Sequence, residues 1–113
     1  MNYEITRQEC EEIHERDNWQ CCYIDDHADR CPNRSQEIAH GISKGKTGRQ
    51  KIKSFWLLLF DEKLMLTGNK MDRIVHHPLN VWASCRKHND YFNISSYEAV
   101  KEKLKEIKKD IDK

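Results

Sequence analysis

The sequence predicts a small α+β domain that is built around a structural zinc knuckle and flanked by N- and C-terminal helices. Three observations predict this fold. Only 37% of the 113 residues are hydrophobic and 35% are charged, so one thin core is all that the chain can bury. Five cysteines and six histidines supply metal ligands that would replace the missing core. The C-terminal segment carries apolar residues at helical spacing.

The composition excludes several classes of protein. The longest apolar run, which contains residues 56–60, is far shorter than the roughly 20 residues that cross a bilayer, so we expect no membrane partner. Residues 1–5 lack the basic and apolar regions of a secretory signal. An odd number of cysteines argues against a disulfide framework and for thiols kept reduced in a cytoplasm. A net charge of +1 means that any nucleic-acid site has to be local.

Both ends of the chain are expected to be helical. The N-terminal helix lies within residues 1–18 and is clearest over residues 4–16. The C-terminal amphipathic helix spans residues 95–113. Each begins with a sequence typical of a capping box, in which a hydroxyl residue precedes a glutamate by three positions: Thr6 with Glu9, and Ser95 with Glu98. The apolar face of the second helix is formed by Val100, Leu104, Ile107 and Ile111.

The middle of the chain alternates between polar and apolar segments. Residues 19–35 are rich in Cys, Asp, Asn and Pro, which predicts a loop or knuckle. Residues 36–42 are expected to form a short strand or extended turn. A flexible basic stretch follows over residues 44–53, and residues 54–66 form a buried helix or a pair of strands. Residues 67–70 predict a turn.

Two well-separated pairs of metal ligands predict the zinc site. The second pair, Cys85 and His88, has the two-residue spacing of a zinc knuckle, which lets both donors converge on one tetrahedral ion. The first pair is separated by nine residues, and Cys22 or His27 competes for a place in it. The expected ligands of the structural Zn²⁺ are Cys21, Cys31, Cys85 and His88. Bound metal would supply folding energy that the thin core lacks.

Three segments resemble the HNH endonuclease family. Residues 15–21 (ERDNWQC) are similar to the lead-in to the first zinc knuckle of that family. Residues 37–42 (EIAHGI) are similar to the strand that carries its first histidine. Residues 77–89 (HPLNVWASCRKHN) are similar to its closing half, in which Asn, four residues, Cys, two residues and a second ligand precede a final His or Asn.

The resemblance implies a ββα-metal finger clamped by a zinc knuckle, and metal-dependent hydrolysis of phosphodiester bonds. The chain is then a single HNH-like domain over residues 1–113, with its core at 19–92 and an insertion at about 44–75. Such small chains are typical of phages and other mobile elements, so we expect a phage-encoded protein in the cytoplasm of a bacterial host.

The resemblance also implies catalytic roles. His40 corresponds to the general base, Asn80 to the asparagine that orients the base, and Asn89 to a ligand of the catalytic ion, Mg²⁺ or another divalent metal. The family has Asp or His immediately before the base, where this chain has Ala39. Three other residues are candidates for the missing donor: Glu37, His76 and His77.

The basic stretch after His40 is expected to contact the phosphates of a nucleic acid. Its five cations are Lys44, Lys46, Arg49, Lys51 and Lys53. The resulting function is a small HNH-like nuclease that cuts DNA. The first alternative is a catalytically reduced zinc module that binds nucleic acid or a protein partner, such as a phage-encoded inhibitor or adaptor. The second alternative is a zinc-free adaptor that uses its C-terminal helix as an interface.

Overall fold

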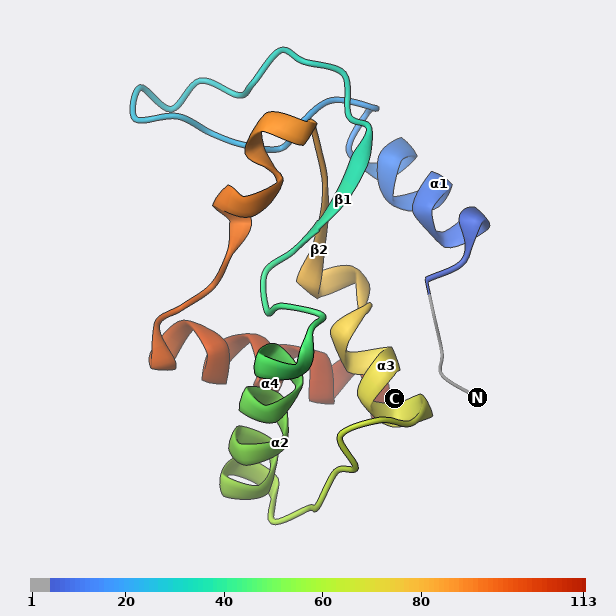
Figure 1. Cartoon of the computed structure of the whole chain (residues 1–113), viewed down its shortest axis with the longest axis vertical. Helices are drawn as coiled ribbons and strands as arrows, with labels where there is room; N and C mark the ends of the chain where they lie inside the picture. The colour runs from blue at the N-terminus through green and yellow to red at the C-terminus, as the bar shows by residue number, and fades with distance from the viewer. Residues whose placement is uncertain (1–4) are drawn as a thin grey trace.

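The computed structural model describes residues 5–113 and confirms the α+β class (Figure 1). The start of the expected N-terminal helix, at residues 1–4, lies outside the described residues. The elements are α1 (Arg7–Arg16), β1 (Glu37–His40), α2 (Lys46–Phe60), α3 (Asn69–Val75), the 3-10 turn η1 (Pro78–Asn80), β2 (Val81–Ser84), the 3-10 helix η2 (Arg86–Phe92) and α4 (Tyr97–Ile111). Strands β1 and β2 pair antiparallel, with Glu37 opposite Ser84 and His40 opposite Val81.

The N-terminal cap predicted for α1 is confirmed, whereas the cap predicted for α4 lies one residue from its observed position. Helix α1 has the predicted capping box, because the Thr6 hydroxyl accepts from the Glu9 amide and the Glu9 carboxylate accepts from the Thr6 amide. The box predicted at Ser95 is wrong by one residue. Ser96 caps α4 instead, and its hydroxyl accepts from the amide of Ala99. The expected inner face is confirmed, with Val100, Leu104 and Ile107 buried.

The flexible basic stretch is wrong as a structure, because α2 begins at Lys46 and runs to Phe60. The helix combines the basic residues and the apolar run in one element. Ile52 and Trp56, one helical turn apart, are fully buried in the main core. Packing of Ile52 and Trp56 against the core stabilises the whole segment as a helix. The charge pattern alone does not predict this helix.

Helix α3 was not expected from the sequence. Its seven residues are too few to show a period, and it begins at Asn69, inside the predicted turn. The glycine before it, Gly68, adopts a positive φ of 148°, which a residue with a side chain rarely adopts. Met71, Ile74 and Val75 are buried, so α3 is part of the core.

The molecule has two apolar centres rather than one. Figure 1 shows the 19–36 loop at one end, helices α2, α3 and α4 at the other, and the sheet between them. The main core consists of buried residues from the helices, namely Ile42, Ile52, Trp56, Leu64, Met71, Ile74, Val75, Val100, Leu104 and Ile107. The second centre is the buried cysteine cluster beneath the loop. No helix within residues 5–113 is long and apolar enough to cross a membrane.

We expect Gly48→Ala to destabilise the protein by about 3 kcal/mol, because helix α2 begins against the preceding loop. A Cβ at Gly48 would lie 1.9 Å from the carbonyl oxygen of Ser43, whose backbone cannot rotate away as a side chain would. This clash outweighs the gain of about 1 kcal/mol that alanine normally brings to a helix interior. Gly45→Ala is the matched control, since its Cβ would meet nothing nearer than 3.6 Å and costs less than about 1 kcal/mol. Urea unfolding of both variants measures the difference, and equal stabilities would contradict the prediction.

Candidate metal centre and the neighbouring cavity

The four expected zinc ligands lie together. The ligand atoms of Cys21, Cys31, Cys85 and His88 are all within 4.8 Å of one another. His88 Nδ1 lies 3.7 Å from the sulfur of Cys21 and 3.4 Å from that of Cys85. Bonds of about 2.3 Å to sulfur and 2.0 Å to nitrogen give a zinc tetrahedron edges of about 3.5–3.8 Å. The cluster therefore has the donor set and the dimensions to hold a metal ion such as zinc.

The arginine at position 30 holds the long loop between the first two cysteines. Its guanidinium donates to the backbone carbonyls of Cys21, at 3.0 Å, and Gln20, at 2.9 Å. The amide of Cys31 donates to the carbonyl of Tyr23 at 2.8 Å, which closes the loop above them. These bonds place Cys31 beside Cys21 despite the nine residues between the two cysteines.

Neither alternative ligand joins the cluster. Cys22 points toward the Gln20 carbonyl and the Arg30 guanidinium. Burial, followed by a hydrogen bond with Asp17 and the charge of that carboxylate, raises the pKa of the Cys22 thiol to about 11, so this residue stays a protonated thiol. His27 lies exposed in the turn at the tip of the loop, away from the other donors.

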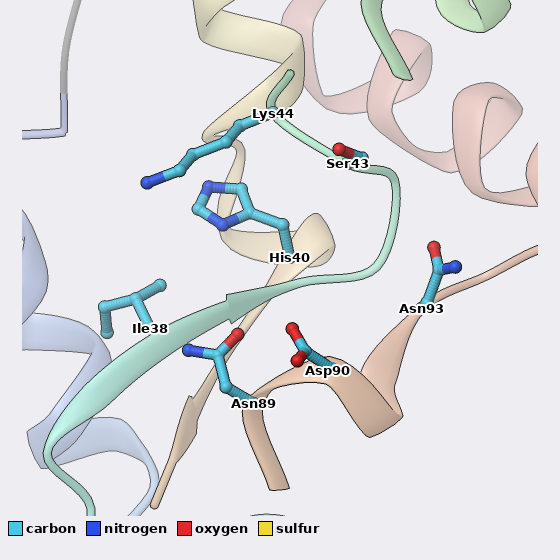
Figure 2. A pocket seen from close by; sticks show the side chains of 7 residues that line it. All are labelled: Ile38, His40, Ser43, Lys44, Asn89, Asp90 and Asn93. Carbon is cyan, nitrogen blue, oxygen red and sulfur yellow. The ribbon is translucent and has the colours of Figure 1, made fainter. Parts of the chain in front are cut away.

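A cavity of about 470 Å³ lies between β1, the loop that follows it and η2. It is lined by Ile38, His40, Ser43, Lys44, Asn89, Asp90 and Asn93. Figure 2 shows the His40 imidazole between the Lys44 side chain on one side and Asn89 on the other. The cavity therefore combines an imidazole, an ammonium group, a carboxylate and several amide groups.

His40 is held at one ring nitrogen and open at the other. Its Nε2 lies 3.0 Å from Nδ1 of His76, which follows α3. Its Nδ1 has no hydrogen-bond partner among residues 5–113. Burial lowers the pKa of His40 to about 4, with further contributions from His76 and from the cations Lys44 and Arg49. The imidazole is therefore neutral at pH 7.

Asn80 fixes the loop after His40 but does not line the cavity. Its fully buried side chain accepts from the Ile42 amide at 2.8 Å, and donates to the carbonyls of Ile42 at 3.1 Å and Val75 at 2.8 Å. Its backbone carbonyl accepts from the amide of Gly41 at 2.9 Å. A Cβ at Gly41 would lie 2.7 Å from Ile94 and 2.9 Å from Trp82, so a glycine is required where the chain turns.

The candidates for the missing donor lie in different places. Glu37 accepts from the Asn89 amide at 2.8 Å and contacts Arg86 at 3.5 Å, but it does not line the cavity. His77 is used structurally, because its Nε2 bonds to Asp110 at 2.7 Å and its Nδ1 accepts from the backbone of η1. Ala39 is fully buried opposite Trp82 and offers no donor.

The sequence analysis missed Asp90 and gave His76 a different role. Asp90 lines the cavity beside Asn89, and Figure 2 shows its carboxylate directed toward β1. Only its position next to Asn89 could have pointed to it. His76 was considered as a metal ligand, whereas the structure bonds it to His40.

The five basic residues of the 44–53 stretch lie in different environments and do not form one flexible segment. Lys44 lines the cavity, whereas the Arg49 guanidinium bonds to the buried carboxylate of Asp72 at 2.5 Å and to the Lys44 carbonyl at 2.8 Å. The remaining three cations, Lys46, Lys51 and Lys53, lie along helix α2. Lys44 is thus the member of the set that is placed to act in the cavity.

Comparison with models of protein families, with characterised proteins and with solved structures found no match for this chain. The likeness to HNH endonucleases thus rests on the sequence motifs.

We expect the purified chain to bind about one Zn²⁺, as measured by elemental analysis. Cys85→Ser should abolish this binding and lower the free energy of unfolding by about 4 kcal/mol, because the second apolar centre then loses the ion that joins its loops. Cys22→Ser is the matched control, since this thiol lies outside the cluster, and it should keep the metal. A wild-type chain that carries no metal and unfolds identically with and without a chelator would contradict the assignment.

We expect acid to destabilise the protein partly through His40. Between the ordinary pKa of 6.5 and the folded value of about 4, the unfolded chain binds a proton that the folded protein does not. The free energy of unfolding therefore falls as the pH is lowered through this window, by at most about 3 kcal/mol from this residue. His40→Gln, which keeps a polar atom near His76, should show a shallower loss between pH 6.5 and 4 in urea titrations. The comparison isolates His40, because the pKa values of His14 and His76 are also lowered and act in the same direction in both proteins. Parallel curves would refute it.

Proposed function

We propose that this chain is a small metal-dependent nuclease of HNH type that hydrolyses the phosphodiester bonds of DNA, with His40 as its general base. One observation carries the proposal. His40 and Asn89 border a single cavity, and Asn80 fixes the loop that joins His40 to the rest of the chain. The three residues that the resemblance names thus line or support one cavity, although they come from separate segments of the chain.

The order of the elements supports the proposal. Strands β1 and β2 pair antiparallel, and η2 follows β2 and packs against β1, an arrangement similar to a ββα-metal finger. Helices α2 and α3 form the insertion between the two strands. The third element differs from the family in being a 3-10 helix.

His40 has the chemistry of a base in this cavity. General-base action at Nδ1 requires the tautomer in which Nε2–H donates to His76 Nδ1, because the lone pair then lies on the open nitrogen. His76 is the positioning residue that selects this tautomer and holds the ring. A low pKa keeps the imidazole neutral, so it is ready to accept a proton at pH 7.

The proposed step is an attack by water on a backbone phosphate. His40 Nδ1 takes the proton of the water, the water oxygen bonds to phosphorus, and the bond to the leaving ester oxygen breaks. Solvent returns a proton to that oxygen. The Lys44 ammonium, which lines the same cavity, stabilises the negative charge that accumulates on the phosphate.

The cavity offers two oxygen donors for a hard divalent cation, the side chains of Asn89 and Asp90. One carboxylate and one amide fit Mg²⁺, because this ion takes most of its ligands from water and phosphate. When bound, the ion would polarise the phosphate and stabilise the leaving oxygen. Asp90 would thereby provide the carboxylate that Ala39 lacks.

A second candidate function is a zinc module on the same scaffold that binds nucleic acid or a protein without cleaving it. Two observations favour it. Ala39 has no donor atom where the family has a metal ligand. A base with a pKa of about 4 also abstracts protons with less driving force than one near 7.

We expect the zinc-loaded protein to nick supercoiled plasmid DNA in the presence of Mg²⁺, Mn²⁺ or Ni²⁺. His40→Gln should reduce the rate by about 10²- to 10⁴-fold, because it removes the base while keeping the ring position filled. His77→Gln is the matched histidine control, since His77 bonds to Asp110 outside the cavity, and it should retain activity. Absence of nicking with all three ions, together with DNA binding that His40→Gln leaves intact, would replace the nuclease with the zinc module.

A further inference from the structure

A basic groove lies over the metal cluster, on the other side of Glu37 from the His40 cavity. It has a volume of about 350 Å³ and is lined by Asn33, Arg34, Gln36, Cys85, Arg86 and Lys87. Among residues 5–113, those that line it include three cations, two amides and no carboxylate. None of these cations belongs to the basic stretch that the sequence analysis selected.

Arg34 is held in place by a stack of rings. Its guanidinium lies over the indole of Trp19, 5.4 Å from the ring centroid, and Trp19 stacks on the buried imidazole of His14 at 4.8 Å. His14 is in turn bonded to the Ser35 hydroxyl at 2.7 Å. A guanidinium that stacks on a ring keeps its N–H groups free in its own plane, where a phosphate binds. The contact is a cation–π interaction of an exposed side chain, so it holds the guanidinium beside the groove and leaves its N–H groups accessible to an anion.

Arg86 and Lys87 form the opposite wall and are exposed. The Arg86 side chain is 80% exposed, and its contact with Glu37 is 3.5 Å long, beyond the usual range of a hydrogen bond. This weak surface pair leaves the guanidinium available to a stronger anion. The groove thus presents two arginines and a lysine from two separate loops.

Metal binding fixes both walls. Asn33 lies two residues after Cys31 and donates to the Cys85 sulfur at 3.8 Å, while Arg86 and Lys87 directly follow Cys85. A zinc ion with three thiolates and a neutral imidazole carries one net negative charge, which the three cations outweigh. The groove therefore stays positive when the cluster is loaded.

Helix η2 contributes lining residues to both the groove and the His40 cavity. Arg86 and Lys87 begin η2, and Asn89 and Asp90, which line the cavity, follow two to four residues later. At about 2 Å per residue of a 3-10 helix, the separation is about 4–8 Å along the axis. Successive phosphates of one strand lie farther apart than the axial rise of about 3.4 Å per nucleotide, so this separation is at most about two nucleotides.

We propose that the groove formed by Arg34, Arg86 and Lys87 binds a backbone phosphate one to two nucleotides from the phosphate that enters the His40 cavity. The inference rests on the proposed function and names the second contact of the same substrate. The ligand chemistry is a phosphodiester backbone, which duplex DNA, single-stranded DNA and RNA share.

The experiment measures binding without cleavage. The full-length zinc-loaded protein, with no Mg²⁺ added, is titrated into labelled duplex DNA, single-stranded DNA and RNA oligonucleotides between 50 and about 200 mM salt, and fluorescence anisotropy gives Kd. Arg34→Ala and Arg86→Ala should each weaken binding about tenfold and lower the slope of log K against log salt by about one. Arg34→Lys should keep the slope but bind more weakly, because lysine keeps the charge and loses the stacked fork.

Lys109→Ala is the control of equal charge, since Lys109 is exposed on α4, which lies at the end of the molecule away from the loop (Figure 1), and it should leave both quantities unchanged. Zinc content and circular dichroism check that each variant is folded. The nucleic acid that shows the arginine-dependent slope is the substrate class. Slopes for the two arginine variants equal to that of Lys109→Ala, in a protein that binds and nicks DNA, would overturn the groove while leaving the nuclease proposal standing. A wild-type protein that binds none of the three oligonucleotides would overturn both.

Discussion

The buried carboxamide of Asn80 is the interaction on which the arrangement of this protein depends. Its three side-chain hydrogen bonds join the chain just after β1, the last residue of α3 and the start of β2. Because every partner is a buried backbone group, loss of the side chain would leave those groups without compensation in a low-dielectric interior. The helical core and the sheet are joined at this point, and the position of His40 follows from it.

The segment over residues 44–75 has a structural role that its charge pattern conceals. Helices α2 and α3 bring Ile52, Trp56 and Ile74 to the inner face of α4 and so build the main core. The same helices supply Arg49 and Asp72, whose ion pair is almost wholly buried, and His76, which holds His40. The residues that surround His40 thus come with the core, and the environment that keeps His40 neutral is a product of helix packing.

The sequence predicted the features that depend on short spacing and missed those that depend on packing. The capping box at Thr6, a short strand or extended turn over residues 36–42 and the convergence of Cys85 with His88 follow from local chemistry, and the structure confirms them. Helix α3 has too few residues to show a period. The Arg49–Asp72 ion pair joins residues more than twenty positions apart in the sequence. A flexible basic stretch was predicted because lysines dominate residues 44–53, whereas one buried stripe determines the helix.

The His40 cavity lacks a metal-binding donor at position 39, and the cations around it suggest how it would still hold a phosphate. Negative charge on phosphorus oxygens can be balanced by protein cations as well as by a metal ion, and such cations are present in both places, with Lys44 lining the cavity and Arg34 and Arg86 lining the groove. A neutral His40 adds no positive charge of its own, so attraction of the substrate falls to these cations. Burial is the main cause of the low pKa that keeps His40 unprotonated, and the Lys44 ammonium lowers the pKa further because it favours the neutral ring. Lys44 is therefore coupled electrostatically to His40, and the cation that would hold a phosphate in the cavity adds to the effect of burial in weakening the base.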